Sequence, residues 1–193
     1  MSIFSLSLCG EPGGELMRSI HVFAMLLAWA APARAYGENR FGAEMLWAHN
    51  VERQSVNAPP MIWDSRLASD AEGYAAELAG TGQWRHSTPG RRTGQGENLW
   101  VGTRGAFSLA DMIASWSSEK RNFRPGVFPN VSRNGSWHGV GHYTQIVWPT
   151  TTRVGCGLRS SADRDYLVCR YSSPGNIIGD RIGDPQVAAR WHN

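Results

Sequence analysis

Helical patterns fill the first half of this sequence and strand patterns the second, and this order limits the fold more than any other feature. Apolar residues recur at helical spacing over residues 39–56 and 67–78. A third such pattern follows Ser108, which forms an approximate capping box with Asp111. Segments rich in aromatic and β-branched residues come mainly after these helices. Helices first and strands later predict an α+β domain, with helices on the faces of an antiparallel sheet.

The ends of the second helix are the clearest. It begins after Asp64 or Ser65, because either side chain can accept hydrogen bonds from the first backbone N–H groups of a helix. Gly80 and Gly82 end it. In the first helix, the face that we expect to be buried carries Phe41, Met45, Ala48, His49 and Val56.

Strands are expected over residues 142–148, 154–158 and 166–172, where aromatic and β-branched residues concentrate. The Gly- and Arg-rich connection 85–104 has room for a further short strand. In this interpretation His142 begins the first strand.

Two cysteines outside the N-terminal region lie in the last two strands. A hairpin that places Leu158 opposite Leu167 also places Cys156 opposite Cys169, two residues further from the turn on each strand. Opposed residues are roughly 4.5–5.5 Å apart at Cα, a distance that a disulfide can bridge. In an exported protein the sequence therefore predicts a disulfide, whereas a pair of buried thiols is the alternative in a reducing compartment.

The N-terminal region has the pattern of a secretory signal peptide. A basic start, an apolar stretch over 22–31 and the small-x-small end Ala33-Arg34-Ala35 predict cleavage after Ala35. The apolar stretch is too short to span a bilayer, which needs about 20 residues. An amphipathic or buried N-terminal helix is the alternative.

Residues 1–35 are thus predicted to be an N-terminal extension plus signal peptide, with the translation start at Met17. Residues 36–193 are predicted to form a single secreted domain, extracellular, or periplasmic in a Gram-negative bacterium, without a transmembrane anchor. We expect a monomer. The formal net charge is only +3 and the arginines are scattered, so a nucleic-acid partner is not expected.

Four short motifs occur in the order typical of one family. The segments GHYTQIVWPTT (141–151) and YLVCRYSSPGNI (166–177) match its two signatures, except that Ser173 departs from the second. The motifs HNVER (49–53) and GENLW (96–100) precede them. Over nearly all of the predicted mature domain, the chain resembles the CAP superfamily of cysteine-rich secretory proteins, antigen 5 and pathogenesis-related class 1 proteins.

This resemblance implies a three-layer α-β-α sandwich with a central antiparallel sheet and a cavity in which four residues converge. These residues, the tetrad, are His86, Glu97, Glu119 and His142. His86 and His142 would bind a divalent cation such as Zn²⁺ weakly, since a catalytic zinc usually has three protein ligands. Glu97 and Glu119 are the candidates for orienting the imidazoles or for accepting a proton from a metal-bound water. A purely structural hydrogen-bond network is the alternative.

Five further motif residues are expected to support the tetrad or the fold. Asn50 and Arg53 would bond loops across the domain. Asn98 and Gln145 would satisfy backbone groups beside the tetrad, and Tyr143 would lie in the core.

Three functions stay open at this point. The chain can be a secreted binding module for a small hydrophobic ligand or a protein, and some eukaryotic relatives bind sterols or fatty acids. It can be a metal-dependent, peptidase-like hydrolase that uses the tetrad, or a scaffold in which the tetrad is structural. The sequence has neither a nucleophile elbow nor an HExxH helix, which favours binding over catalysis.

Overall fold

A four-stranded sheet in the order β1-β4-β5-β2 carries the rest of the domain. The computed structural model describes residues 33–183, with side chains from Arg40 onward. The helices are α1 (Ala33–Ser55), α2 (Ser65–Thr81), α3 (Leu109–Ser117) and α4 (Gly141–Ile146), and the short 3-10 helices are η1 (Pro89–Arg91), η2 (Ser118–Arg121) and η3 (Trp137–Gly139). The strands are β1 (Ile62–Trp63), β2 (Gly96–Thr103), β3 (Gly126–Val127), β4 (Arg153–Ser160), β5 (Arg164–Ser172) and β6 (Arg181–Ile182).

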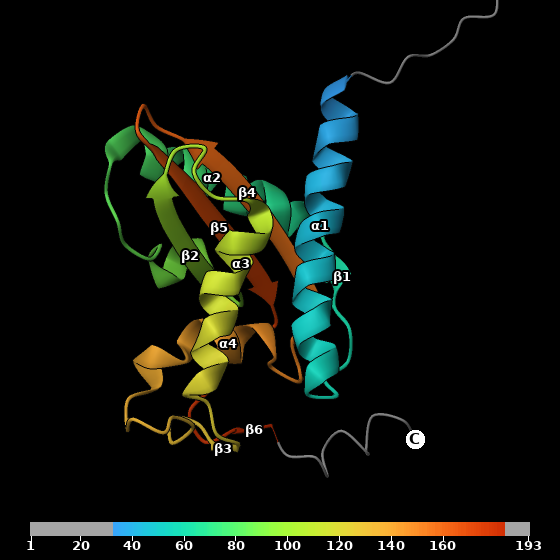
Figure 1. Cartoon of the computed structure of the whole chain (residues 1–193), viewed down its shortest axis with the longest axis vertical. Coiled ribbons are helices and arrows are strands. Elements are labelled where there is room, and N and C mark those ends of the chain that lie inside the picture. Colours follow the sequence, from blue (N-terminus) through green and yellow to red (C-terminus); the bar gives the residue numbers. More distant parts are fainter. Residues whose placement is uncertain (1–32, 184–193) are drawn as a thin grey trace, which may run out of the picture. The chain divides into compact units, whose positions relative to one another are not determined.

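The sheet lies between two layers of helices (Figure 1). Helix α2 covers one face, where Leu99 and Val168 pack against its apolar residues. Helices α1, α3 and α4 cover the other face, around Trp116 and Trp148. The predicted α-β-α sandwich is confirmed. The sheet differs from the prediction in one pairing, because the two-residue strand β1 runs parallel to β4.

The β4–β5 hairpin has the predicted register. Leu158 lies opposite Leu167, and Cys156 opposite Cys169, with 4.1 Å between the cysteine Cα atoms. The predicted disulfide between these cysteines is confirmed.

Two glycines of β4 allow α2 to lie close to the sheet. A Cβ atom at Gly155 would collide with the backbone of Ala68, and one at Gly157 with that of Glu72. Asp64 caps the start of α2 by accepting bonds from the N–H groups of the next turn, as predicted.

Arg53 of α1 is fully buried and joins three segments of the domain. Its guanidinium donates hydrogen bonds of 2.6–2.9 Å to four backbone carbonyl oxygens, those of Pro59, Ile146, Trp148 and Thr151. Burial lowers the pKa of Arg53 to about 10, so the group stays charged at neutral pH. One ionised side chain therefore fixes the end of α1, the end of α4 and the connection to β4.

The prediction of a strand over 142–148 is wrong, because this segment begins with helix α4, Gly141–Ile146. Side chains from distant segments stabilise both of its ends. Glu119 accepts bonds from the N–H groups of the second and third residues, and Arg53 donates to the carbonyl of the last. These bonds satisfy backbone N–H and C=O groups that have no partner within a short helix, and this offsets the preference of its residues for a strand.

The predicted signal peptide falls outside the described residues, apart from positions 33–35. Its cleavage after Ala35, and the start at Met17, stay predictions.

His49 is fully buried beneath the sheet, on α1. Its Nδ1 lies 2.7 Å from the carbonyl oxygen of Met45, and its Nε2 lies 3.0 Å from the hydroxyl of Tyr171. Burial lowers the pKa of His49 from 6.5 to about 4, so the folded protein keeps this ring neutral.

Replacing His49 with Gln should flatten the pH dependence of stability in mild acid. Below about pH 6.5 the unfolded chain binds a proton at this position that the folded protein does not bind until near pH 4. Because of this difference, the free energy of unfolding of the wild type should fall by about 2 kcal/mol as the pH is lowered from about 7.5 to about 5. Urea unfolding at the two pH values measures it. His138→Gln, at an exposed position, should keep the wild-type loss, and an equal loss in His49→Gln would show that His49 is not responsible.

Candidate functional site

The structure binds each predicted imidazole to one predicted carboxylate. Nδ1 of His86 lies 2.7 Å from Oε1 of Glu97, and Nδ1 of His142 lies 2.7 Å from Oε1 of Glu119. Within residues 33–183, neither Nε2 atom has a hydrogen-bond partner. Both rings reach solvent, with 55% and 34% of their side-chain surfaces exposed. The two pairs therefore present ring nitrogens that an ion can approach.

Glu97 is the more deeply buried carboxylate, with 1% of its side chain exposed. Besides His86, it accepts bonds from the backbone N–H and the hydroxyl of Ser87, each at 2.9 Å. Nη2 of Arg170 lies 3.0 Å from Oε2. Burial alone would raise the pKa of Glu97, but the bond from His86, the charge of Arg170 and the bonds from Ser87 outweigh it and hold that pKa below its usual value.

Arg170 is a buried partner of the site that the sequence analysis did not single out. It lies opposite Glu97 in the β2–β5 register, and only 2% of its side chain is exposed. It also donates to Oε1 of Gln95 and lies over the ring of Tyr74, 5.4 Å from its centroid. The sequence signal is a charged residue within the otherwise apolar segment Tyr166–Tyr171 of β5.

The second pair is organised by Glu119 in η2. Its Oε2 accepts the backbone N–H groups of His142 and Tyr143 at 2.9 and 3.0 Å, while Oε1 holds the ring of His142. The ring of Trp116 stacks on that of His142, with 5.9 Å between centroids and 13° between planes. Trp116 in turn donates to the carbonyl of Leu99 on β2, which ties this pair to the sheet.

The two pairs meet at the first residues of β2, an edge strand of the sheet. Glu97 and Asn98 are consecutive, so their side chains leave opposite faces of the strand. Glu97 reaches His86, and Asn98 donates bonds of 3.1 Å to the carbonyl of His142 and to the hydroxyl of Tyr171. The strand thus connects the two pairs.

The other predicted supporting residues hold the backbone around these pairs. Gln145 accepts a bond from the N–H of Gly175 and donates one to Thr151. Asn50 exchanges two bonds with the backbone of Met61. Tyr143 is buried in the core.

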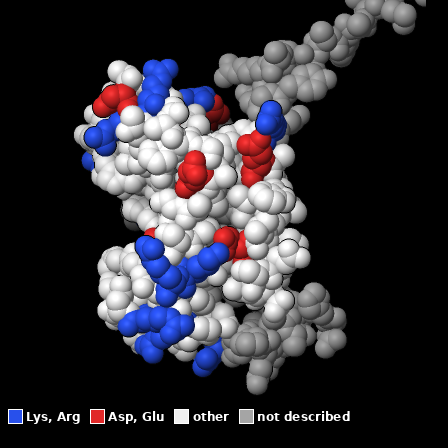
Figure 2. Space-filling view, viewed as in Figure 1, with Lys and Arg blue, Asp and Glu red and all other residues white. Residues whose placement is uncertain are grey.

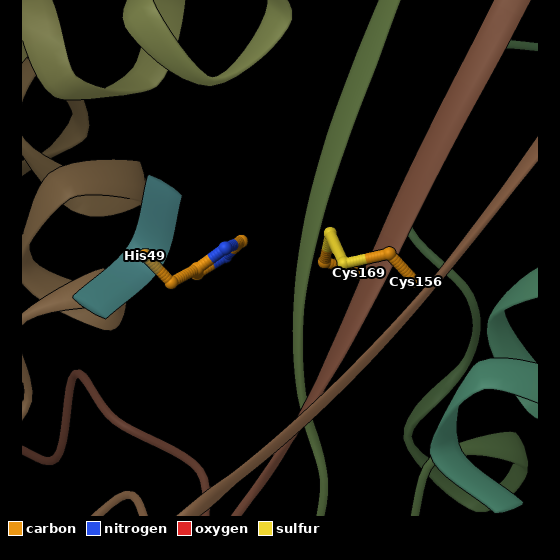
Figure 3. A group of neighbouring side chains, drawn as sticks. All are labelled: His49, Cys156 and Cys169. Atoms are coloured by element: carbon orange, nitrogen blue, oxygen red, sulfur yellow. A yellow bond between two sulfur atoms is a disulfide. The ribbon is translucent and has the colours of Figure 1, made fainter. Parts of the chain in front are cut away.

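The tetrad does not form one tight cluster. Among the described residues, the group with three potential ligand atoms within 4.8 Å of one another is His49, Cys156 and Cys169 (Figure 3). The two sulfurs are bonded to each other, and both nitrogens of His49 already have partners. This group is therefore part of the core and offers no free ligand atom.

Comparison with known proteins agrees with this fold. The model of the cysteine-rich secretory protein (CAP) family matches residues 46–171. A pathogenesis-related protein of PR-1 type from Sambucus nigra is 34% identical over 69% of this chain and 77% of its own length. The basic form of pathogenesis-related protein 1 from Nicotiana tabacum is 37% identical over 70% of this chain and 72% of its own length.

Solved structures give the same result. A crystal structure of NaASP2 with Zn²⁺ has a TM-score of 0.63 at 25% identity, and the match covers 74% of this chain and 84% of that protein. Venom allergen-like protein 4 of Schistosoma mansoni has a TM-score of 0.57 at 21% identity, over 76% of this chain and 97% of that protein, and shows the fold alone.

The molecule is thus an α-β-α sandwich with two His–Glu pairs at the edge of its sheet. The chain belongs to the cysteine-rich secretory protein (CAP) family and is related to pathogenesis-related PR-1 proteins.

Replacing Arg170 with Met should lower the free energy of unfolding by about 3 kcal/mol, because it leaves the carboxylate of Glu97 buried without its charged partner. Adding Glu97→Gln should recover part of this loss, since no buried charge then remains unpaired. Chemical denaturation of the single and double variants at neutral pH measures both effects. Arg164→Met, on the same strand but exposed, is the control and should change stability by less than about 0.5 kcal/mol. If Arg170→Met lowers the free energy of unfolding by no more than Arg164→Met does, the role of this ion pair is contradicted.

Proposed function

We propose that this chain is a secreted binding protein in which His86 and His142 bind a divalent cation, Zn²⁺ in particular, through their Nε2 atoms. The observation that carries the proposal is that Nδ1 of each histidine is bonded to a glutamate carboxylate. Each glutamate accepts the Nδ1 proton, so a neutral ring directs the lone pair of Nε2 away from its carboxylate. Zinc binds such imidazole nitrogens, and two protein ligands leave positions for water or for a group of a partner. A modest affinity follows.

The comparisons and the sequence support this proposal. NaASP2, 25% identical, has a crystal structure with Zn²⁺. Secretion is supported by the family's description as secretory proteins, by the predicted signal peptide and by the disulfide between Cys156 and Cys169. None of the helices within residues 33–183 is long and apolar enough to cross a bilayer.

The bonds of the two carboxylates favour an orienting role over proton transfer. Oε1 and Oε2 of Glu97 share four donors, from His86, Ser87 and Arg170. Glu119 accepts bonds from one ring and two backbone N–H groups. Because this capacity is used within the protein, we assign both glutamates to holding the imidazoles.

Titration calorimetry with ZnCl₂ tests the metal site. The wild type should bind one Zn²⁺ with saturable heat, and His86→Ala/His142→Ala should lose this binding because both Nε2 ligands are removed. His138→Ala, at an exposed position outside the pairs, should bind as the wild type does. Binding that persists in the double variant, with its fold verified by circular dichroism, would refute the site.

A pocket on α1 supports a second candidate function, the binding of a fatty acid or sterol. The pocket has a volume of about 650 Å³, within the range of small-molecule sites. Two of its apolar residues are exposed, Trp47 by 69% and Val51 by 42%. Its lining residues are Trp47, Asn50, Val51, Gln54, Asn57, Ala58, Pro59 and Pro60.

Trp47→Ala should weaken the binding of a fluorescent fatty acid roughly tenfold, because it removes the largest apolar side chain of the pocket. Fluorescence titration measures the affinity. Trp84→Ala removes a tryptophan that is 50% exposed and outside the pocket, so it should leave the affinity unchanged. If the wild type takes up neither fatty acid nor sterol in a saturable manner, the pocket has no such role.

A further inference from the structure

We propose that the end of the domain that carries β3 and β6 binds the surface of an anionic lipid membrane. This surface, the β3–β6 end, combines exposed arginines with exposed apolar side chains. Its members are Arg121, Arg124, Val127, Arg133, Ile177 and Ile178.

The arginines of this end are held outward by the backbone. Phe123 and Ser132 form a β-bridge and are both buried. Arg124 and Arg133 follow them directly in the chain and are exposed, with their backbone N–H groups bonded across the same ribbon. Arg121, at the end of η2, is exposed as well. These three guanidinium groups make no ion pair with any acidic residue in the described part of the chain.

Charge is strongly one-sided in this region. Residues 121–133 and 177–183 contain four arginines and one acidic residue, Asp180. Figure 2 shows basic side chains gathered over the lower half of the molecule in this view, with acidic ones only at the upper border of that area. Arginine binds phosphate groups through two parallel hydrogen bonds, which suits the headgroups of anionic lipids.

The apolar side chains distinguish a membrane from a soluble polyanion. Ile178 is 79% exposed, Ile177 41% and Val127 38%. In the β3–β6 pair, Gly126 lies opposite the buried Ile182, so the next pair, Val127 and Arg181, faces outward. Apolar residues beside basic ones are the composition of a surface that lies in the headgroup region of a bilayer.

The turn that carries the two isoleucines is anchored at both ends. The side chain of Asn176 accepts a bond of 2.6 Å from Thr144 and donates one of 2.9 Å to the carbonyl of Gly141. Past the isoleucines, the N–H of Gly179 donates to the carbonyl of Phe128 at 2.9 Å. These bonds hold the backbone of the turn against the domain, so that little of its conformational freedom is left to lose on binding.

Co-sedimentation with lipid vesicles tests the proposal. The purified protein should bind vesicles of phosphatidylcholine with phosphatidylglycerol, but not phosphatidylcholine alone, and binding should weaken as salt rises. The triple variant Arg121→Gln/Arg124→Gln/Arg133→Gln should lose roughly a hundredfold in affinity, or about fivefold for each arginine. Ile177→Ser/Ile178→Ser should lose at least about tenfold on the same vesicles, because the apolar contact is removed.

The control has the same net charge as the arginine variant. Arg66, Arg85 and Arg164 are exposed outside the β3–β6 end, and changing all three to Gln should leave binding unchanged. All variants share the same N-terminal region, so its contribution cancels. Absence of binding to anionic vesicles, or equal losses in the two triple variants, would overturn the proposal. A second outcome would overturn the proposal in favour of an acidic polysaccharide. In that outcome Ile177→Ser/Ile178→Ser binds both immobilised heparin and the anionic vesicles as strongly as the wild type does.

Discussion

The fold depends on the burial of one charged group, the guanidinium of Arg53. Removing such an ion from water costs several kcal/mol, and the structure offsets this cost with four bonds to backbone carbonyls. Two of these carbonyls belong to Ile146 and Trp148, at and just beyond the end of α4. A helix of six residues does not form by itself. Arg53 therefore holds in place the helix that carries His142.

Glu119 completes this arrangement from the other side. Its carboxylate binds the N–H groups at the start of α4 and the ring of His142 at the same time. Glu97 likewise binds the backbone of Ser87 and the ring of His86. Each acid is thus both a structural bond and the support of an imidazole. This double role explains why the sequence alone cannot separate a structural network from a metal site.

Local signals made part of the fold predictable. Asp64 and Ser108 indicate helix starts, because their side chains accept hydrogen bonds from nearby backbone N–H groups. The pairing of the two cysteines follows from the alternation of side chains along the strands. Helix α4 was not predictable, because its ends are held by residues from α1 and η2 while its own residues favour a strand. The four members of the tetrad came from the family resemblance. Arg170 lies far along the chain from Glu97, so the sequence can mark it as an unusual charge but shows it as the partner of Glu97 only when the β2–β5 register is known.

The candidate functions lie where the fold leaves bonding capacity unused. Within the described residues, the buried side-chain nitrogens and oxygens without a partner are Oγ of Ser117 and Nε of Arg170. Nearly every other buried polar atom is satisfied inside the domain, as stable proteins require. The groups that stay open are at the surface: two imidazole nitrogens at the edge of β2, the exposed ring of Trp47 and the isoleucines beside the arginines of the β3–β6 end. The satisfied interior therefore confines the candidate binding groups to the edges of the domain.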